Sequence, residues 1–381
     1  MPDTEKFFIT NSILPLSESE KRVLGIVHRR DGLSQPIIAR ETGFAQQSVS
    51  RLVNALLERG ALCETDRLPN GRRGQPSMHV KVAADFACTV GIALMSDAIS
   101  LAVMDFSGAI LEVEQHSMPA MTRRPVVEKI KTSLDQIIRK RGIDRSRIFG
   151  CGVGVSGYSL GGSGRFNTVR SLDDWALVNI EEILTGELGI AVWAENDGNA
   201  AAVGESLVGA GRSHASFAYL YIAAGLGGGI IINHELVRGC HGNAGEVALI
   251  LPQRIYPHPN LELLRQILAQ HGTEFESISD MLAAFDIKWP GVDEWIVKTR
   301  ESFSLICSAL AATLDPQAIV IGGRIPGVLA EKVIPHIEIY NEARRLEPRM
   351  TPRLIVSETA GDACAIGAAA LPFKSYFFSA Q

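Results

Sequence analysis

Cysteine is scarce in this 381-residue chain, and its six copies are scattered without any Cys-x-x-Cys or Cys-x-Cys pair. This spacing excludes a zinc ribbon and a disulfide framework, and it predicts reduced thiols. Uninterrupted apolar runs of membrane-spanning length are also missing, because the longest candidate, residues 88–106, is broken by Asp97 and predicts a β-hairpin. The first residues, MPDTEKFFITNS, lack the basic start and apolar stretch of a signal peptide. We therefore expect a cytoplasmic protein without membrane contact.

Basic residues do not outnumber acidic ones, with 37 Lys/Arg against 42 Asp/Glu. The net charge is −5, which argues against a protein that coats nucleic acid over its whole surface. Residues 1–80, however, hold 11 Lys/Arg against 9 Asp/Glu, so a slightly basic end precedes an acidic body. This distribution favours nucleic-acid contact confined to the N-terminal part. The length suits two or three domains.

Three stretches divide the chain. Residues 1–16 are predicted to be a short mobile lead, and residues 17–82 show three helices followed by a hairpin. From residue 84 onward, glycine-bearing turns between β-branched runs alternate with helical patterns, which is typical of an α/β fold. A strand–turn–strand pattern occurs at 90–106 and again at 217–233. This similarity predicts two related lobes with a cleft between them.

Residues 17–59 have the pattern of a helix-turn-helix. Ser17 and Glu20 form a capping box, Ser34 is predicted to cap the second helix, and Gly43 supplies the turn before the third. The third helix, about 45–59, has an apolar face at helical spacing. Its opposite face is polar and mostly uncharged, with side chains suited to base edges and phosphates in the major groove. These candidate DNA-binding residues are Gln46, Gln47, Ser48, Ser50, Arg51 and Asn54.

A hairpin follows this helix and predicts a wing. Strands are expected at 61–65 and 78–82, and the tip between them is flanked by glycines and holds adjacent arginines. Arg72, Arg73 and Gln75 are the candidates for contacts to phosphates or to a narrow minor groove. A small helical domain for protein contacts is the alternative interpretation. The helix-turn-helix and the basic wing together favour binding of double-stranded operator DNA.

Four segments of the body carry its most informative residues. WAENDGNAAA at 193–202 leaves a strand and opens a helix, where carboxylate and amide groups face a cleft. AAGLGGGI at 223–230 is a glycine-rich turn, and a second glycine cluster at 239–246 ends in Glu246. LDPQAIVIGG lies at 314–323. In this order, the four segments resemble the ROK family, which groups bacterial sugar-responsive repressors with sugar kinases.

The resemblance implies the fold and its division. An actin-like (ribonuclease-H-like) two-lobed α/β fold is expected after a winged helix-turn-helix domain at residues 1–83. The small lobe would comprise residues 84–194 plus a C-terminal helix near 362–378, and the large lobe residues 195–361. Within the family, the xylose and N-acetylglucosamine repressors are the nearest kind.

The resemblance also implies a sugar site. Matched residue by residue, the family's sugar-contacting positions fall on Gly157, Asn196, Asp197, Glu246 and, as a less certain match, Glu262. Carboxylates and amides suit a sugar because its hydroxyls both donate and accept hydrogen bonds. The alternative for Asn196 and Asp197 is simple helix capping.

The sequence departs from the family's phosphate-binding motif. ROK kinases carry Asp-x-Gly-Gly-Thr in the first hairpin, whereas this chain has Ala93 in place of the acid and Met95 and Ser96 in place of the glycines. Side chains would occupy the space of the phosphates, and Asp97 would add a negative charge beside them. We therefore expect no ATP binding and no catalytic residue, with Asp197 kept only as a sugar ligand.

The family's structural zinc is also expected to be absent. Leu249 stands at the position of the usual histidine ligand, and residues 251–259 hold no cysteine, although His258 is present. That histidine also touches the sugar in the family. Leu249 is therefore expected to make the pocket more apolar, which would suit a deoxy, acetylated or otherwise less polar sugar; a degenerate site with no ligand is the alternative.

These inferences lead to one main hypothesis and two alternatives. The main one is a sugar-responsive transcription regulator, with repression as the expected sign, that acts as a homodimer or a dimer of dimers because helix-turn-helix proteins bind paired half-sites. The enzymatic alternative is a sugar kinase with a fused DNA-binding domain. The third is an adaptor whose body binds a protein partner. The sugar, the operator and the regulated genes do not follow from the sequence.

Overall fold

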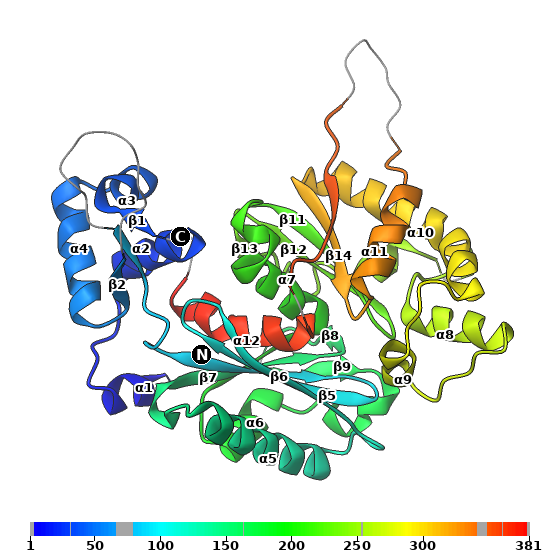
Figure 1. Cartoon of the computed structure of the whole chain (residues 1–381), viewed down its shortest axis with the longest axis horizontal. Helices are drawn as coiled ribbons and strands as arrows, with labels where there is room; N and C mark the ends of the chain where they lie inside the picture. The colour runs from blue at the N-terminus through cyan, green and yellow to red at the C-terminus, as the bar shows by residue number, and fades with distance from the viewer. Residues whose placement is uncertain are drawn as a thin grey trace.

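The computed structural model describes residues 4–30, 32–65, 79–162, 164–252, 254–340, 349–359 and 361–378. Three folded parts are visible in Figure 1: a helical domain near the N-terminus and two lobes, each built around a five-stranded sheet. The winged domain and the two related lobes expected from the sequence are therefore present. In the ranges given above, no helix is both long and apolar enough to span a membrane.

The N-terminal domain consists of three helices and a small sheet. Its elements are α2 (Glu18–Arg29), β1 (Leu33–Ser34), α3 (Gln35–Thr42), α4 (Gln46–Glu58), β2 (Leu62–Thr65) and β3 (His79–Val82), with sheet order β1-β3-β2. The predicted capping box is confirmed, because the Ser17 side chain accepts from the Glu20 backbone and Glu20 accepts from Ser17 in return. Ser34 occupies the N-cap position of α3 but makes no capping hydrogen bond. We call this unit the winged domain.

The expectation of a mobile N-terminal lead is wrong for residues 5–10. They form α1 (Glu5–Thr10), which packs against the small lobe rather than against the winged domain. Phe7 and Phe8 are buried, and Phe149 lies within ring contact of both. The Asn11 side chain also donates to the Ser146 carbonyl at 2.7 Å. Burial of two aromatic rings explains why this short segment is ordered.

The small lobe has a mixed sheet of order β10-β7-β4-β5-β6. Its strands are β4 (Cys88–Leu94), β5 (Ala98–Asp105), β6 (Ile110–Ser117), β7 (Ile148–Val155) and β10 (Val192–Asn196). The predicted hairpin at 88–106 is confirmed by the antiparallel pairing of β4 with β5. Helices α5 (Arg123–Arg141) and α6 (Ile180–Leu188) cover the outer face (Figure 1). A two-stranded ribbon, β8 (Gly157–Ser159) and β9 (Phe166–Thr168), and the short helices η1 (Arg145–Arg147) and η2 (Arg170–Trp175) complete the lobe.

The large lobe repeats this plan with a sheet of order β13-β12-β11-β14-β15. The strands are β11 (Phe217–Ile222), β12 (Leu226–Ile232), β13 (Glu235–Leu236), β14 (Ala318–Gly323) and β15 (Arg353–Val356). In each lobe an antiparallel hairpin adjoins a parallel strand, which explains the similar patterns at 90–106 and 217–233. The helices are α7 (Asp197–Val208), α8 (Leu261–Gln270), α9 (Ile278–Ala283), α10 (Pro290–Leu314) and α11 (Gly327–Val333), with η3 (Ala210–Arg212), η4 (Val247–Ile250) and η5 (Ile334–His336) between them.

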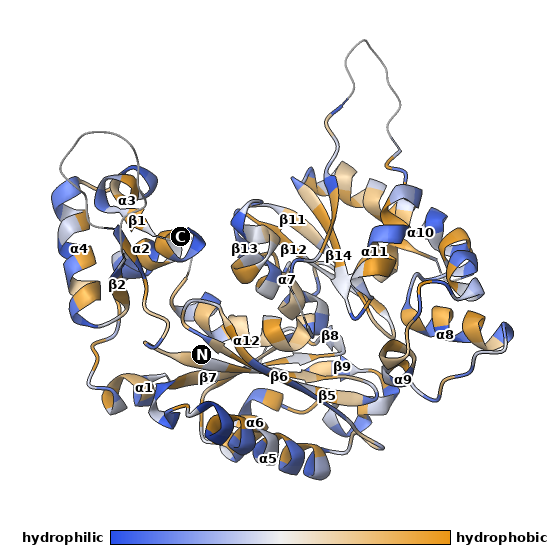
Figure 2. Ribbon diagram, in the orientation of Figure 1, coloured by the Kyte–Doolittle hydropathy of each residue, from blue (hydrophilic) through white to orange (hydrophobic). Residues whose placement is uncertain are grey.

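Helix α12 (Ala363–Tyr376) lies between the two sheets, on the inner face of the small-lobe sheet and against α7 (Figure 1). Its residues 363–373 are buried, and Figure 2 shows it as mostly hydrophobic, whereas α5 combines hydrophobic and hydrophilic residues. The approach is very close: a Cβ on Gly152 would lie 1.8 Å from the Ala368 carbonyl oxygen, and one on Gly367 would lie 2.0 Å from that of Ala200. Only glycine allows helix and strand backbones to approach in this way.

Candidate ligand cavity and DNA interface

A cavity of about 550 Å³ lies between the lobes, at the ends of strands from both sheets. Ligand sites of α/β proteins occupy this position. Four of the five predicted sugar-contacting residues line it, namely Gly157, Asn196, Asp197 and Glu246. The fifth, Glu262, does not.

The connection from β10 to α7 positions Asn196 and Asp197. Asn196 is the N-cap residue of α7, where its side-chain oxygen accepts from the Asn199 backbone at 3.1 Å and its Nδ2 donates to the Gly157 carbonyl at 2.8 Å. Asp197 begins the helix, and its Oδ2 accepts a 2.6 Å hydrogen bond from the Ser156 hydroxyl. The capping and ligand-binding interpretations of Asn196 are therefore compatible, since both groups sit at the wall of the cavity.

The two cavity carboxyls share an unusual electrostatic environment. Burial raises the pKa of Asp197 to about 6, although hydrogen bonds from Ser156 and from the Gly198 backbone act in the opposite direction. Burial also raises the pKa of Glu246, and the nearby charge of Asp197 adds to this effect. A carboxyl that is costly to ionise gains from partners that donate hydrogen bonds to it, as sugar hydroxyls do.

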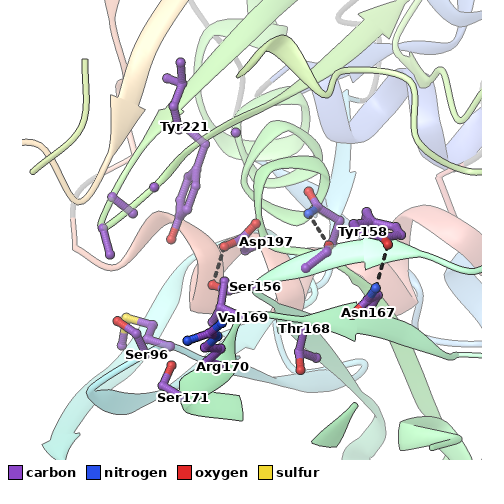
Figure 3. A pocket seen from close by; sticks show the side chains of 18 of the residues that line it. Ser96, Ser156, Tyr158, Asn167, Thr168, Val169, Arg170, Ser171, Asp197 and Tyr221 are labelled. Carbon is purple, nitrogen blue, oxygen red and sulfur yellow. Dashed lines mark hydrogen bonds between the residues drawn. The ribbon is translucent and has the colours of Figure 1, made fainter. Parts of the chain in front are cut away.

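The opposite wall of the cavity consists of small-lobe residues that the sequence analysis missed. Figure 3 shows Tyr158, Asn167, Thr168, Arg170 and Ser171 along this wall, with Tyr221 facing them from β11. The Asn167 side chain donates to the Tyr158 hydroxyl at 2.5 Å. No recognisable motif marks these residues, because they come from the short β8–β9 ribbon and η2. Hydroxyl, amide and guanidinium groups thus face the carboxyls across the cavity.

Glu262 and Leu249 lie elsewhere. Glu262 is in the first turn of α8, where its carboxylate pairs with Arg265 at 2.8 Å and accepts from Gln266. Hydrogen bonds from Arg265 are the largest cause that lowers the pKa of Glu262. The expectation that Leu249 makes the pocket more apolar is wrong, because its side chain is 84% exposed and does not line the cavity.

The turn between β4 and β5 forms an ion pair with the large lobe. Met95, Ser96 and Arg324 line the cavity, and Asp97 accepts a hydrogen bond from Arg324 of the large lobe at 3.0 Å. Ser279, at the start of α9, donates to Asp97 through its backbone and its hydroxyl. Burial alone would raise the pKa of Asp97, but Arg324 and Ser279 more than offset this and hold it below its usual value. The expected free negative charge is therefore neutralised.

The glycine-rich segment at 223–230 has a packing role. Gly227, Gly228 and Gly229 are inside β12 rather than in the turn. A Cβ on Gly198, in the first turn of α7, would lie 2.7 Å from the backbone of Gly228. The glycines therefore let α7 approach the strand closely, which brings Asp197 to the edge of the cavity.

Leu249 and His258 are the two residues at the position that the resemblance assigns to the family's zinc ligands. Leu249 points outward, and His258 forms a 3.3 Å hydrogen bond with the Leu251 carbonyl. The described ranges contain no group of three or more His, Cys, Asp or Glu side chains able to hold a metal ion. Leu249 has no donor atom for zinc, and one imidazole cannot replace a tetrahedral ligand set.

The second candidate site is the outer face of α4. Gln46, Gln47, Arg51 and Asn54 are exposed, whereas Ser48 and Ser50 are half-buried. Val49, Val53 and Leu56 of the same helix are buried against α2 and α3, so the polar face points outward. The other predicted DNA-binding residues, Arg72, Arg73 and Gln75, lie outside the described residues. The α4 face has the length and polarity of a recognition helix.

Comparisons with known proteins agree with this arrangement. The model of the ROK family matches residues 89–258, and that of the MarR family matches residues 14–74. The body of the chain is therefore similar to ROK family proteins, and its N-terminal helix-turn-helix is similar to that of the MarR family. A crystal structure of a ROK family transcriptional regulator, a homologue of the E. coli MLC protein, superposes with a TM-score of 0.70 at 19% identity, covering 99% of this chain and 98% of that one. The expected two-lobed, actin-like fold after a winged domain is thereby confirmed.

Relatives of this chain include named repressors and a kinase. The uncharacterized protein y4fQ of Sinorhizobium fredii is 27% identical over 388 residues, covering 96% of this chain and 94% of that protein. The xylose repressor of Caldicellulosiruptor bescii is 27% identical over 216 residues, and the glucokinase of Streptomyces coelicolor is 31% identical over 164. The similarity covers 56% of this chain and 54% of the repressor, and 42% of this chain and 48% of the glucokinase. The chain thus spans about half the length of each of these two.

Proposed function

We propose that this ROK protein is a sugar-responsive transcription regulator that binds operator DNA through the winged domain and a small carbohydrate in the cavity between the lobes. Repression is the proposed sign of regulation, and a homodimer the proposed form. The observation that carries the proposal is the combination, in one chain, of an outward polar face on α4 and a polar cavity around Asp197. The similarity to a xylose repressor supports it.

The sugar would bind through the groups that converge on Asp197. Asp197 and Glu246 are acceptors for adjacent hydroxyls, while Asn196 and the hydroxyls of Ser156 and Tyr158 can serve as either donors or acceptors. A ligand held by both lobes binds better to one degree of lobe closure than to another. Only such a difference in affinity can shift the equilibrium between two states of the regulator.

A thermal-shift screen tests the sugar half of the proposal. The panel contains D-xylose, D-glucose, N-acetyl-D-glucosamine and D-glucose 6-phosphate, each at millimolar concentration, against the wild type and Asp197→Asn. A positive result is a rise in melting temperature with one sugar that the variant loses. If no sugar raises the melting temperature, even at about 50 mM, the result would contradict sugar binding.

Selection of DNA from random duplexes tests the other half. The wild type should enrich a two-fold symmetric sequence whose half-sites are about one helical turn apart, since a homodimer presents two recognition helices. The sugar that raises the melting temperature should then change the affinity for the selected DNA. Monomeric behaviour in sedimentation, with and without DNA, would contradict the dimer.

The enzymatic alternative is a sugar kinase, and one observation favours it. The pKa of Asp197, raised to about 6, suits a general base for a sugar hydroxyl near neutral pH. Against it stand Met95 and the Asp97–Arg324 ion pair, which occupy the turn where the family's kinases bind phosphates. We propose that ATP is not a ligand and that zinc is not a cofactor. Phosphorylation of any panel sugar by ATP would support the kinase and overturn the regulator-only proposal.

A further inference from the structure

The winged domain is joined to the body by the chain itself, and it also contacts the body through side chains. These contacts lie between α2 and the C-terminal end of α12. His28, in the last turn of α2, is 7% exposed and lies with its ring centroid 4.3 Å from that of Phe378. Lys21, earlier on α2, places its ammonium 4.3 Å from the centre of the Tyr376 ring. We call these two contacts the α2–α12 joint.

The body side of the joint is rigid. Phe378 is 2% exposed and packs against Phe106 and Phe373, with ring centroids at 5.1 and 6.0 Å. The adjoining Phe377 is buried among further aromatic rings of the small lobe. Closely packed aromatic rings have few alternative arrangements, so a displacement of α12 moves the Phe378 ring with it.

On the winged-domain side of the joint, the buried His28 ring lacks hydrogen-bond partners among the described residues. The Ser107 backbone approaches the His28 ring, yet neither ring nitrogen completes a hydrogen bond with any described residue. Burial lowers the pKa of His28 to about 3, so the ring is neutral at physiological pH. A buried polar group without a partner costs free energy that solvent would recover on separation. The contact is therefore ordered but weaker than an apolar ring would make it.

The other end of α12 reaches the cavity. Asp362, the N-cap residue of α12, is close enough to Asp197 for its charge to add to the effect of burial on the pKa of Asp197. Between the two ends, α12 packs backbone to backbone on α7: a Cβ on Gly204 would lie 2.7 Å from Gly367 Cα. Helix α12 has 14 residues, which corresponds to roughly 21 Å. One tightly held element thus extends from the cavity toward the winged domain.

We propose that α12 couples the cavity to the winged domain, with the contact of His28 with Phe378 as the point of transmission. A change in lobe closure shifts α7 and α12 together, and the joint passes this shift to α2 and hence to the recognition helix. The inference rests on the proposed function, since it needs a ligand in the cavity and DNA on α4. Beyond that function, the inference names α12 as the route of coupling and His28 and Phe378 as the residues that transmit it, and both residues lie outside the proposed ligand and DNA sites.

Spin labels measure docking without any sugar or DNA. Labels at Glu58→Cys on α4 and Gln136→Cys on α5 report the distance between the winged domain and the small lobe, in full-length protein with Cys63 and Cys240 changed to Ser. We expect a narrow distribution of label-to-label distances in this parent protein and a broad one after Phe378→Ala. After His28→Leu the distribution should be at least as narrow as in the parent, because the substitution removes the two ring nitrogens that lack hydrogen-bond partners among the described residues. Phe275→Ala, which truncates a ring that contacts Trp289 in the large lobe at a tilted angle, is the control. Equal distributions for Phe378→Ala and Phe275→Ala would overturn the joint.

Coupling is measured with the panel sugar that gives the largest thermal shift. We expect this sugar to change the DNA affinity of the wild type by about fivefold or more, and that of Phe378→Ala by less than about twofold, while sugar affinity itself stays unchanged. A full sugar response in Phe378→Ala would overturn transmission through α12. If no panel sugar binds the wild type, the proposed sensing function fails and the coupling fails with it, whereas the spin-label result still decides whether the joint docks the winged domain.

Discussion

Arg324 of the large lobe and Asp97 of the small lobe form a 3.0 Å ion pair across the cleft, at the turn between β4 and β5. The Arg324 side chain is 6% exposed and that of Asp97 20%, so solvent screens the pair only weakly. Ser279 bonds to both, with its hydroxyl accepting from Arg324 at 2.8 Å and donating to Asp97 at 2.9 Å. The pair therefore links the two lobes at one end of the cavity in the closure that this structure has.

Removal of Asp97 should destabilise the protein strongly. Asp97→Ala leaves the Arg324 guanidinium buried without its carboxylate, which we expect to lower the free energy of unfolding by about 3 kcal/mol. Chemical denaturation measures it, and Asp293→Ala is the control, because its ion pair with Lys332 is 73% and 37% exposed and is worth less than about 1 kcal/mol. Equal losses for the two variants would show that the pair between the lobes has no special role.

Sugar affinity should depend on pH through Asp197. Its folded-state pKa lies above the ordinary value, at about 6, so the stability linked to its protonated form is present at low pH and is lost as the pH rises through about 6. A bound sugar hydroxyl donates to the ionised form, so affinity should increase up to about tenfold per pH unit below 6 and level off above it. Calorimetric titration from pH 5 to 8 measures this. Asp197→Asn should bind more weakly with a flatter profile, and a wild-type affinity independent of pH would contradict the role of Asp197.

Truncation of the exposed arginine on α4 should weaken DNA binding. Arg51→Ala is expected to reduce affinity for the selected duplex about tenfold, because a base or phosphate contact of arginine contributes about 1–3 kcal/mol. Fluorescence anisotropy at two salt concentrations separates the two kinds of contact: loss of a phosphate contact lowers the salt dependence, whereas loss of a base contact alters sequence preference. Gln136→Ala on α5 is the control. Unchanged affinity would exclude Arg51 from the interface.

The packing of α12 against the small-lobe sheet gives a test of stability. Gly152→Ala places a Cβ 1.8 Å from a backbone carbonyl of α12, and we expect a loss of about 3 kcal/mol or more in the free energy of unfolding. Gly186→Ala is the matched control, and it should change the free energy of unfolding in the opposite direction. It lies within α6 with nothing within 4 Å of the new Cβ, so it should stabilise the protein by up to about 1 kcal/mol. Tolerance of Gly152→Ala would show that α12 is loosely held.

Local patterns predicted the elements well but not their long-range partners. The capping box at Ser17, the two hairpins and the strand-to-helix connection at Asp197 each depend on neighbours within a few residues, which the sequence displays directly. The burial of Phe7 depends instead on Phe149 and Phe86, which no local pattern connects to it.

The cavity shows the same division. Gly157, Asn196, Asp197 and Glu246 stand in motifs, and the structure brings them together. Arg324 follows a recognised segment, but its role depends on Asp97, 227 residues away. Glu262 was placed near the sugar by resemblance alone, yet Arg265, three residues further along α8, takes its carboxylate.

Helix α1 has a consequence for how the DNA-binding part can move. Because residues 5–10 are anchored on the small lobe and β4 begins the same lobe at Cys88, the chain leaves the body, forms the winged domain and returns to the body. The winged domain is thus an insertion with two tethers rather than a head on one flexible stalk. Two covalent attachment points alone would permit rotation about the line that joins them, and the α2–α12 joint is the contact that restricts this rotation. Deletion of residues 1–10 would remove the attachment through α1 and leave the attachment through β4 intact.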